Sequence, residues 1–172
     1  SLDIREDSRI HSSVLNNILE HPKISNYIKN FPSNFFSLNK SEKRKILSKI
    51  EGKVPVSIFQ ESNIVNTLGS IYAIKKIQKL NGEKGCNRYI ISNCGSTYNI
   101  LELFALLRIC DWNSPSIDII PLFETIPDLE SSFEIMKKLY SNKDYFSHLK
   151  NRSLKQTIML GCSDGTKDGG YF

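Results

Sequence analysis

The chain has 172 residues, of which 40% are hydrophobic and 24% are charged, and its formal net charge at pH 7 is +5. This length and composition predict one globular unit with its own core. No apolar run approaches the ~20 residues that cross a bilayer, and no secretory leader precedes Leu2, so we expect a cytoplasmic protein without a membrane segment.

The first part of the chain combines one short strand with helices. The run LDI at residues 2–4 predicts a strand, and apolar residues at helical spacing predict a helix over 7–20. Proline, asparagine and serine residues predict a connecting loop over 21–39. A basic helix is expected directly after this loop.

The rest of the chain alternates helices with apolar runs. Further strands are predicted over residues 88–92, 117–123 and 156–160. Further helices are predicted over residues 62–80, 96–110, 127–140 and 143–150. Ser62 and Thr125 are expected to cap the helices that follow them, because a hydroxyl oxygen can accept hydrogen bonds from the first free backbone N–H groups.

The order of these elements predicts an α/β fold. The strands are continuous apolar runs rather than strict alternations, which is typical of parallel strands covered by helices. Strands separated by helices favour a parallel sheet with right-handed crossovers. Because four strands are too few to close a barrel of eight, we expect residues 1–172 to be a single, incomplete α/β segment of a larger protein.

The sequence KSEKRKILSK at residues 40–49 contributes much of the positive charge. We interpret it as a solvated helix face rather than a nucleic-acid patch, because no aromatic stacking residues are interleaved with the cations. The overall charge nonetheless suits a small anionic substrate.

Polar residues follow each predicted strand. In parallel α/β folds the carboxyl ends of the strands share one face, where active sites are built, so we expect these residues to converge. They are Arg5 and Glu6, Ser92 and Asn93, Glu124 and Thr125, and Ser163, Asp164, Lys167 and Asp168.

Glu124 and Asp164 form the most suggestive pair among them. Two carboxylates on adjacent strand ends can hold Mg²⁺ or Mn²⁺ and leave coordination positions for substrate and water. The alternative is that either carboxylate caps the helix after its strand. The spacing leaves both interpretations open.

The terminal sequence LGCSDGTKDGGYF admits other motifs. GCSDG matches the nucleophile elbow G-x-S-x-G, which would make Ser163 the nucleophile of a hydrolase, but no histidine follows His148 to act as its base. The spacing of Gly161 and Gly165 is too short for a phosphate-binding loop. A calcium loop fits no better, because Thr166 stands where a ligand is needed.

Four ordered blocks resemble a known family. LDIREDSRIH, RYIIS, PLFETIPDL and MLGCSDGTKDGG are similar to consecutive landmarks of phosphoenolpyruvate carboxylase, at similar spacing. They span nearly all of the chain, although the full enzyme is several times longer. The last block departs from the more usual GYSDSAKDAG at Cys162, Gly165 and Gly170 but keeps the acids and the lysine.

The resemblance implies a fold and a reaction. It implies that the chain is part of a (β/α)8 barrel, and that the enzyme converts phosphoenolpyruvate and bicarbonate to oxaloacetate and phosphate with Mg²⁺. By similarity, Glu124 and Asp164 would bind the metal ion, Arg5 would face the substrate phosphate, and Lys167 would assist as a point charge. A salt bridge to a neighbouring aspartate is the alternative for Lys167.

The resemblance also implies a homotetramer, and from the composition we expect neither a nucleic acid nor a membrane as a partner. The family's catalytic histidine region, mobile glycine-rich loop and allosteric region do not match any part of these 172 residues. We therefore expect the segment alone to be inactive. A non-catalytic α/β module that binds a partner is the competing hypothesis.

Overall fold

The computed structural model describes residues 2–161, and its centre is a parallel sheet. Its four strands lie in the order β1, β4, β5 and β6, which is also their order along the chain, and every neighbouring pair is parallel. Their bounds are β1 Asp3–Asp7, β4 Arg88–Ser92, β5 Asp118–Phe123 and β6 Met159–Leu160. The predicted α/β architecture, with a parallel sheet and covering helices, is confirmed.

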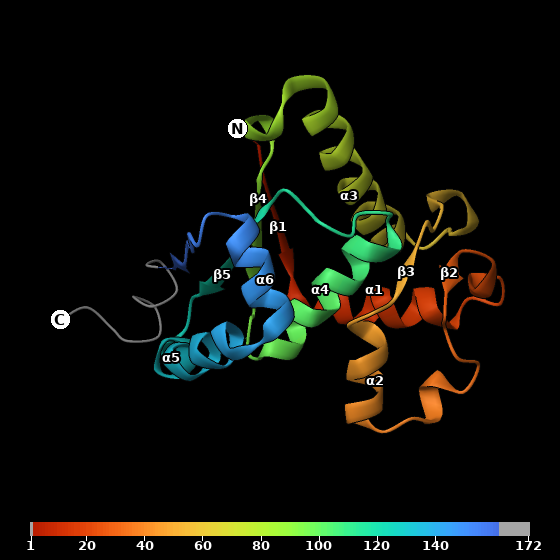
Figure 1. Cartoon of the computed structure of the whole chain (residues 1–172), viewed down its shortest axis with the longest axis horizontal. Helices are drawn as coiled ribbons and strands as arrows, with labels where there is room; N and C mark the ends of the chain where they lie inside the picture. Colours follow the sequence, from red (N-terminus) through yellow and green to blue (C-terminus); the bar gives the residue numbers. More distant parts are fainter. Residues whose placement is uncertain (1, 162–172) are drawn as a thin grey trace.

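Helices connect the strands and cover the sheet (Figure 1). They are α1 Ser8–Glu20, α2 Lys40–Leu47, α3 Ser62–Asn81, α4 Thr97–Ile109, α5 Ile126–Ser141 and α6 Lys143–Asn151. The 3₁₀ turns are Ile24–Asn26, Phe35–Ser37, Val56–Ile58 and Glu83–Gly85. A small antiparallel pair, β2 Ile28–Lys29 and β3 Glu51–Gly52, lies at a distance from the main sheet, beyond α1 (Figure 1).

The two faces of the sheet have different partners. Tyr89 and Ile119 are paired in register and belong to the large buried cluster that the helices share. Ile90 and Ile120, one residue further along, form a separate small cluster on the other face with Leu122. Arg5 is in register with Ile90, so the period-two alternation of a strand places the Arg5 side chain on this second face.

Helix α4 lies at the centre of the helical layer. It contacts α1, α2 and α5, and its buried residues include Leu103, Leu106 and Leu107. Phe104, Ala105 and Ile109 are also buried and lie on other sides of the helix, as expected for a helix that is apolar nearly all round. Burying each of the leucine side chains contributes about 2 kcal/mol, so α4 holds the other helices against the sheet.

Three local predictions differ from the structure. Strand β1 continues to Asp7, so Arg5 lies within the strand rather than after it. Ser62 is the first residue of α3 rather than its cap; Glu61 occupies the cap position without a side-chain hydrogen bond. The last strand is shorter than predicted and not buried, because Ile158 is 41% exposed and Leu160 is 61% exposed. At Gln156 the hydrogen bond to β5 is made by the side chain rather than by the backbone: Gln156 Nε2 donates to the Ile119 carbonyl oxygen at 2.9 Å.

Two further features concern thiols and membranes. Cys86, Cys94 and Cys110 are buried and free, while Cys162 lies outside the described residues. None of the helices within residues 2–161 combines the length and the apolar character that crossing a membrane requires.

Two histidines are buried in the neutral form. His11 is fully buried, and its Nε2 lies 2.8 Å from the Tyr89 hydroxyl oxygen. Burial lowers the pKa of His11 from 6.5 to about 4 and lowers the pKa of His148 in the same way. In the unfolded chain both histidines bind a proton near pH 6.5. In the native chain they bind it only near pH 4.

We expect the free energy of unfolding of the 172-residue chain to fall as the pH is lowered from 7.5 to 5. Each depressed histidine pKa contributes stability that is fully present above pH 6.5 and is lost toward pH 4, and the loss by pH 5 is about 2 kcal/mol per histidine. Urea unfolding at several pH values measures it. His11→Gln should remove about half of this pH dependence; an unchanged dependence would contradict the assignment.

Candidate active site

The carboxyl ends of the strands meet at one edge of the sheet, as predicted. The Ser8 hydroxyl, just after β1, donates to the Asn93 carbonyl oxygen at 2.6 Å. The Asn93 side-chain amide, just after β4, donates to Asp7 Oδ2 at 2.7 Å. These two hydrogen bonds tie the ends of β1 and β4 together.

Arg5 and Glu124 form an ion pair across this edge. Arg5 comes from β1 and Glu124 follows β5, so the pair spans the intervening strand β4. The Arg5 side chain is 55% exposed and the Glu124 side chain 21% exposed, so the pair contributes at most about 1 kcal/mol to stability. Its importance is that it brings a cation and a carboxylate together where ligands can reach both.

The cap of α5 leaves the Glu124 carboxylate available. The Thr125 hydroxyl accepts from the Asp128 backbone N–H at 3.3 Å, and the Asp128 carboxylate accepts from the Thr125 backbone N–H at 3.1 Å. This reciprocal capping box confirms Thr125 as the cap. The alternative that Glu124 itself caps the helix is therefore wrong.

Gly161 gives Glu124 its space. The register of β5 and β6 continues past Leu160, where the Gly161 backbone N–H donates to the Phe123 carbonyl oxygen at 2.9 Å. A Cβ atom at position 161 would lie 2.8 Å from Glu124 Cγ and 3.1 Å from Glu124 Cα. The Glu124 side chain therefore lies directly against a position that has room for glycine alone.

Asp7 is a carboxylate at this edge that the sequence analysis did not single out. Its side chain caps α1 and accepts from Arg9 Nη2 at 2.7 Å, besides the bond from Asn93. Hydrogen bonds from Arg9, opposed by burial, lower the pKa of Asp7 to about 2, so it is ionised at neutral pH. The sequence signal for this role is an aspartate that stands directly between a predicted strand and a predicted helix, because aspartate is a preferred residue at the start of a helix.

Only part of the predicted metal pair can be placed. Glu124 presents carboxylate oxygen, the donor that Mg²⁺ and Mn²⁺ prefer, at the rim of the sheet. Asp164, Lys167 and the alternative nucleophile Ser163 lie outside the described residues. Within residues 2–161 no three His, Cys, Asp or Glu side chains are grouped closely enough to hold a metal ion.

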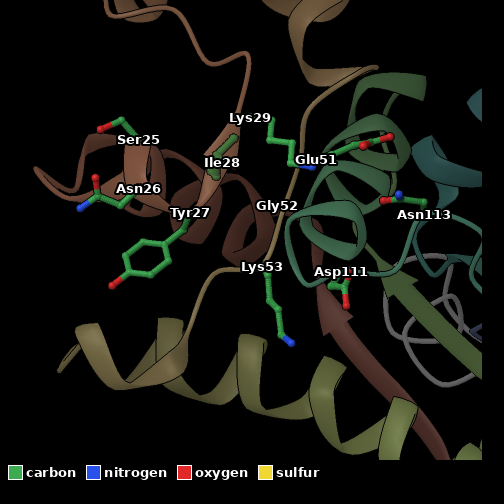
Figure 2. A pocket seen from close by; sticks show the side chains of 10 residues that line it. All are labelled: Ser25, Asn26, Tyr27, Ile28, Lys29, Glu51, Gly52, Lys53, Asp111 and Asn113. Carbon is green, nitrogen blue, oxygen red and sulfur yellow. The ribbon is translucent and has the colours of Figure 1, made fainter.

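A cavity of about 450 Å³ lies elsewhere, at the small β2–β3 pair (Figure 2). Lys29 and Glu51 line it from the two strands, and Lys53 and Asp111 line it further along. Asp111 follows the carboxyl end of α4, and a connecting helix runs back toward the amino ends of the strands. This cavity is therefore separate from the edge that carries Arg5 and Glu124.

Comparison with known proteins identifies the family. A family model described as phosphoenolpyruvate carboxylase matches residues 1–172, which is the whole chain. The chain belongs to the phosphoenolpyruvate carboxylase family. The resemblance seen in the four sequence blocks is confirmed.

The curated relatives are much longer than this chain. It is 33% identical to a phosphoenolpyruvate carboxylase of Nitrosomonas eutropha, an alignment that covers 99% of the chain and 19% of the relative. It is 30% identical to a phosphoenolpyruvate carboxylase of Corynebacterium glutamicum, over 100% of the chain and 19% of the relative. A third, from Prochlorococcus marinus, is 28% identical over 99% of the chain and 18% of its own length. The chain thus spans about a fifth of these family members.

Gly161→Ala should lower the free energy of unfolding of the 172-residue chain by about 1–3 kcal/mol, because the new methyl group overlaps Glu124. Urea unfolding measures the change. Gly69→Ala, within α3, is the matched control: a Cβ there meets nothing within 4 Å, so the helix should gain up to about 1 kcal/mol. Equal effects at the two positions would contradict the close packing of Gly161.

Proposed function

We propose that the intact protein containing this chain catalyses the reaction of phosphoenolpyruvate with bicarbonate to give oxaloacetate and phosphate. The observation that carries the proposal is the meeting of Arg5 and Glu124 at the carboxyl edge of the sheet. Family membership supports it, as do the relatives named phosphoenolpyruvate carboxylase.

Arg5 is the proposed phosphate-binding residue. A guanidinium fork can bind two phosphate oxygens and neutralise charge during phosphoryl transfer. In the described structure Arg5 is engaged by the Glu124 carboxylate and is also half exposed. Substrate binding therefore requires the Arg5 fork to exchange a Glu124 oxygen for phosphate oxygens.

Glu124 and Asp164 are the proposed ligands of a Mg²⁺ or Mn²⁺ ion. Such an ion, when bound, supplies Lewis-acid stabilisation of negative charge on the enolate oxygen. Glu124 fits this role because its carboxylate is not needed as a helix cap and lies at the rim with 21% of the side chain exposed. Lys167 is proposed to add a positive point charge in the same pocket.

The proposed reaction has two bond-exchange steps. A bicarbonate oxygen attacks the phosphorus while the bond between phosphorus and the enol oxygen breaks, giving carboxyphosphate and the pyruvate enolate. The enolate carbon then attacks the carboxyl carbon, and phosphate leaves as oxaloacetate forms. In the first step the Arg5 guanidinium faces the phosphoryl group whose charge is redistributed.

We further propose that residues 1–172 form one incomplete segment of a (β/α)8 barrel. Strand order that follows chain order, with a helical connection between each strand of the sheet and the next, is the arrangement that consecutive units of such a barrel have. Phosphoenolpyruvate and bicarbonate are the proposed partners, with no nucleic acid or membrane. We also propose that the intact protein is a homotetramer in the cytoplasm, where its carbon dioxide fixation would supply oxaloacetate to the tricarboxylic acid cycle.

Removing either charge should abolish most activity of the intact protein. Arg5→Gln and Glu124→Gln should each lower kcat/KM by about 100-fold or more, and Glu124→Gln should also weaken Mn²⁺ binding about tenfold. Coupled oxidation of NADH measures oxaloacetate, and the electron paramagnetic resonance of free Mn²⁺ measures binding. Arg88→Gln, at the amino end of β4, is the control and should change kcat/KM less than about threefold. Full activity of Glu124→Gln would refute the assigned role.

The 172-residue chain alone should form no oxaloacetate from phosphoenolpyruvate, bicarbonate and Mg²⁺. It supplies only part of a site that several strands build together. The same coupled assay, with the intact protein as positive control, tests this. Measurable turnover by the isolated chain would show that the site is complete within it.

A further inference from the structure

A second cavity involves the basic helix α2, which the proposed reaction does not use. It has a volume of about 440 Å³ and lies between α1, α2 and α4, beside the Phe35–Ser37 turn. Lys40, Lys43 and Arg44 line it from α2. Phe35 and Tyr98 line it from the turn and from the first turn of α4.

The cations at this cavity form no salt bridge within the part of the chain that the structure describes. Glu42, the acid on α2, is held in the capping box with Asn39, with both hydrogen bonds at 3.0 Å. The acid nearest to the cations in sequence is therefore committed to the start of the helix.

Aromatic rings and a carbonyl group hold two of the cations in place. Lys43 Nζ donates to the Phe36 carbonyl oxygen at 3.0 Å and lies 5.8 Å from the centre of the Phe35 ring. The Arg44 guanidinium lies 5.4 Å from the centre of the Tyr98 ring. These contacts orient the two cations without pairing either with a carboxylate. The sequence did not show this, because both rings come from outside the basic segment.

The wall opposite α2 carries hydrogen-bonding groups. Glu102 is 4% exposed and accepts a hydrogen bond from the Ser12 hydroxyl. Burial raises the pKa of Glu102, and hydrogen bonds from Ser12 and Asn99 oppose this shift. Asn16 and Ser96 add polar groups to the lining of the cavity. The cavity thus combines three cations, two aromatic surfaces and a few convergent polar groups.

We propose that this cavity binds a small molecule that carries a phosphate or carboxylate group. The anionic group would lie among Lys40, Lys43 and Arg44, and the body of the ligand against Tyr98 and Phe35. Its volume falls within the range of about 300–1,000 Å³ that is usual for small-ligand sites. A hollow bounded by three helices favours such a ligand over a nucleic acid, which needs an open basic stripe.

The site is distinct from the candidate active site. None of its lining residues is among the residues assigned to the reaction, and it lies on the outer side of α4 rather than on the face of the sheet that carries Arg5. Anion binding at this cavity therefore does not depend on the proposed reaction. The first turn of α4 that lines it follows the end of β4, so a ligand there would contact the helix that leads away from the active edge.

The experiment is isothermal titration calorimetry of the intact protein with inorganic phosphate and, separately, with malonate. All variants carry Arg5→Gln, which removes the phosphate site assigned to the reaction. The double variant Lys43→Gln, Arg44→Gln should weaken binding of the preferred anion about tenfold or more. Lys49→Gln is the matched control, because it removes a charge just after α2 without lining this cavity, and it should change affinity less than about twofold.

The two anions separate the possible ligand sources. Tighter binding of phosphate indicates a phosphorylated ligand, and tighter binding of malonate indicates a dicarboxylate. Either result supports the proposal if the double variant loses binding of the preferred anion. Absence of saturable binding of both anions would overturn the proposal. Equal losses in the double variant and in Lys49→Gln would also overturn it, since they would indicate only the general charge of the surface. Unchanged thermal unfolding midpoints without ligand show that the variants remain folded.

Discussion

Parallel pairing of β1, β4 and β5 is the constraint on which the rest of the structure depends. It gives all three strands one direction, so residues that follow them meet at a single edge. Arg5 and Glu124 are 119 positions apart in the chain and still form an ion pair there. The helices make this possible by covering one face of the sheet with the large buried cluster, so that the opposite face can carry the Arg5 side chain.

Helix capping decides which acids remain available for function. Asp128 is bound to the start of α5 and Glu42 to the start of α2, each in a reciprocal capping box. The first leaves Glu124 free to face Arg5, and the second holds Glu42 at Asn39 rather than in a salt bridge with the α2 cations. In both places a short polar residue before the helix determines the electrostatics of a site several residues away.

Much of the fold follows from sequence patterns, because the apolar runs and helical spacings are local. Thr125 was recognisable as a cap for the same reason, whereas Ser62 was not distinguishable from Glu61 beside it. The convergence of polar residues also follows from parallel topology. The direct contact of Arg5 with Glu124 does not, since it depends on how long side chains lean along the sheet, and neither does the pairing of Arg44 with Tyr98. Asp164 and Lys167 remain predictions.

The exposed end of the sheet has a practical consequence. Leu160 on β6 is 61% exposed, and Phe133 on α5 is 71% exposed. Among the described residues β6 pairs only with β5, so its other side presents backbone donors and acceptors next to the exposed Leu160. Such an edge can recruit strands from other molecules. A recombinant version limited to these residues would therefore tend to aggregate, and Lys or Glu in place of Leu160 is the change that would improve its solubility.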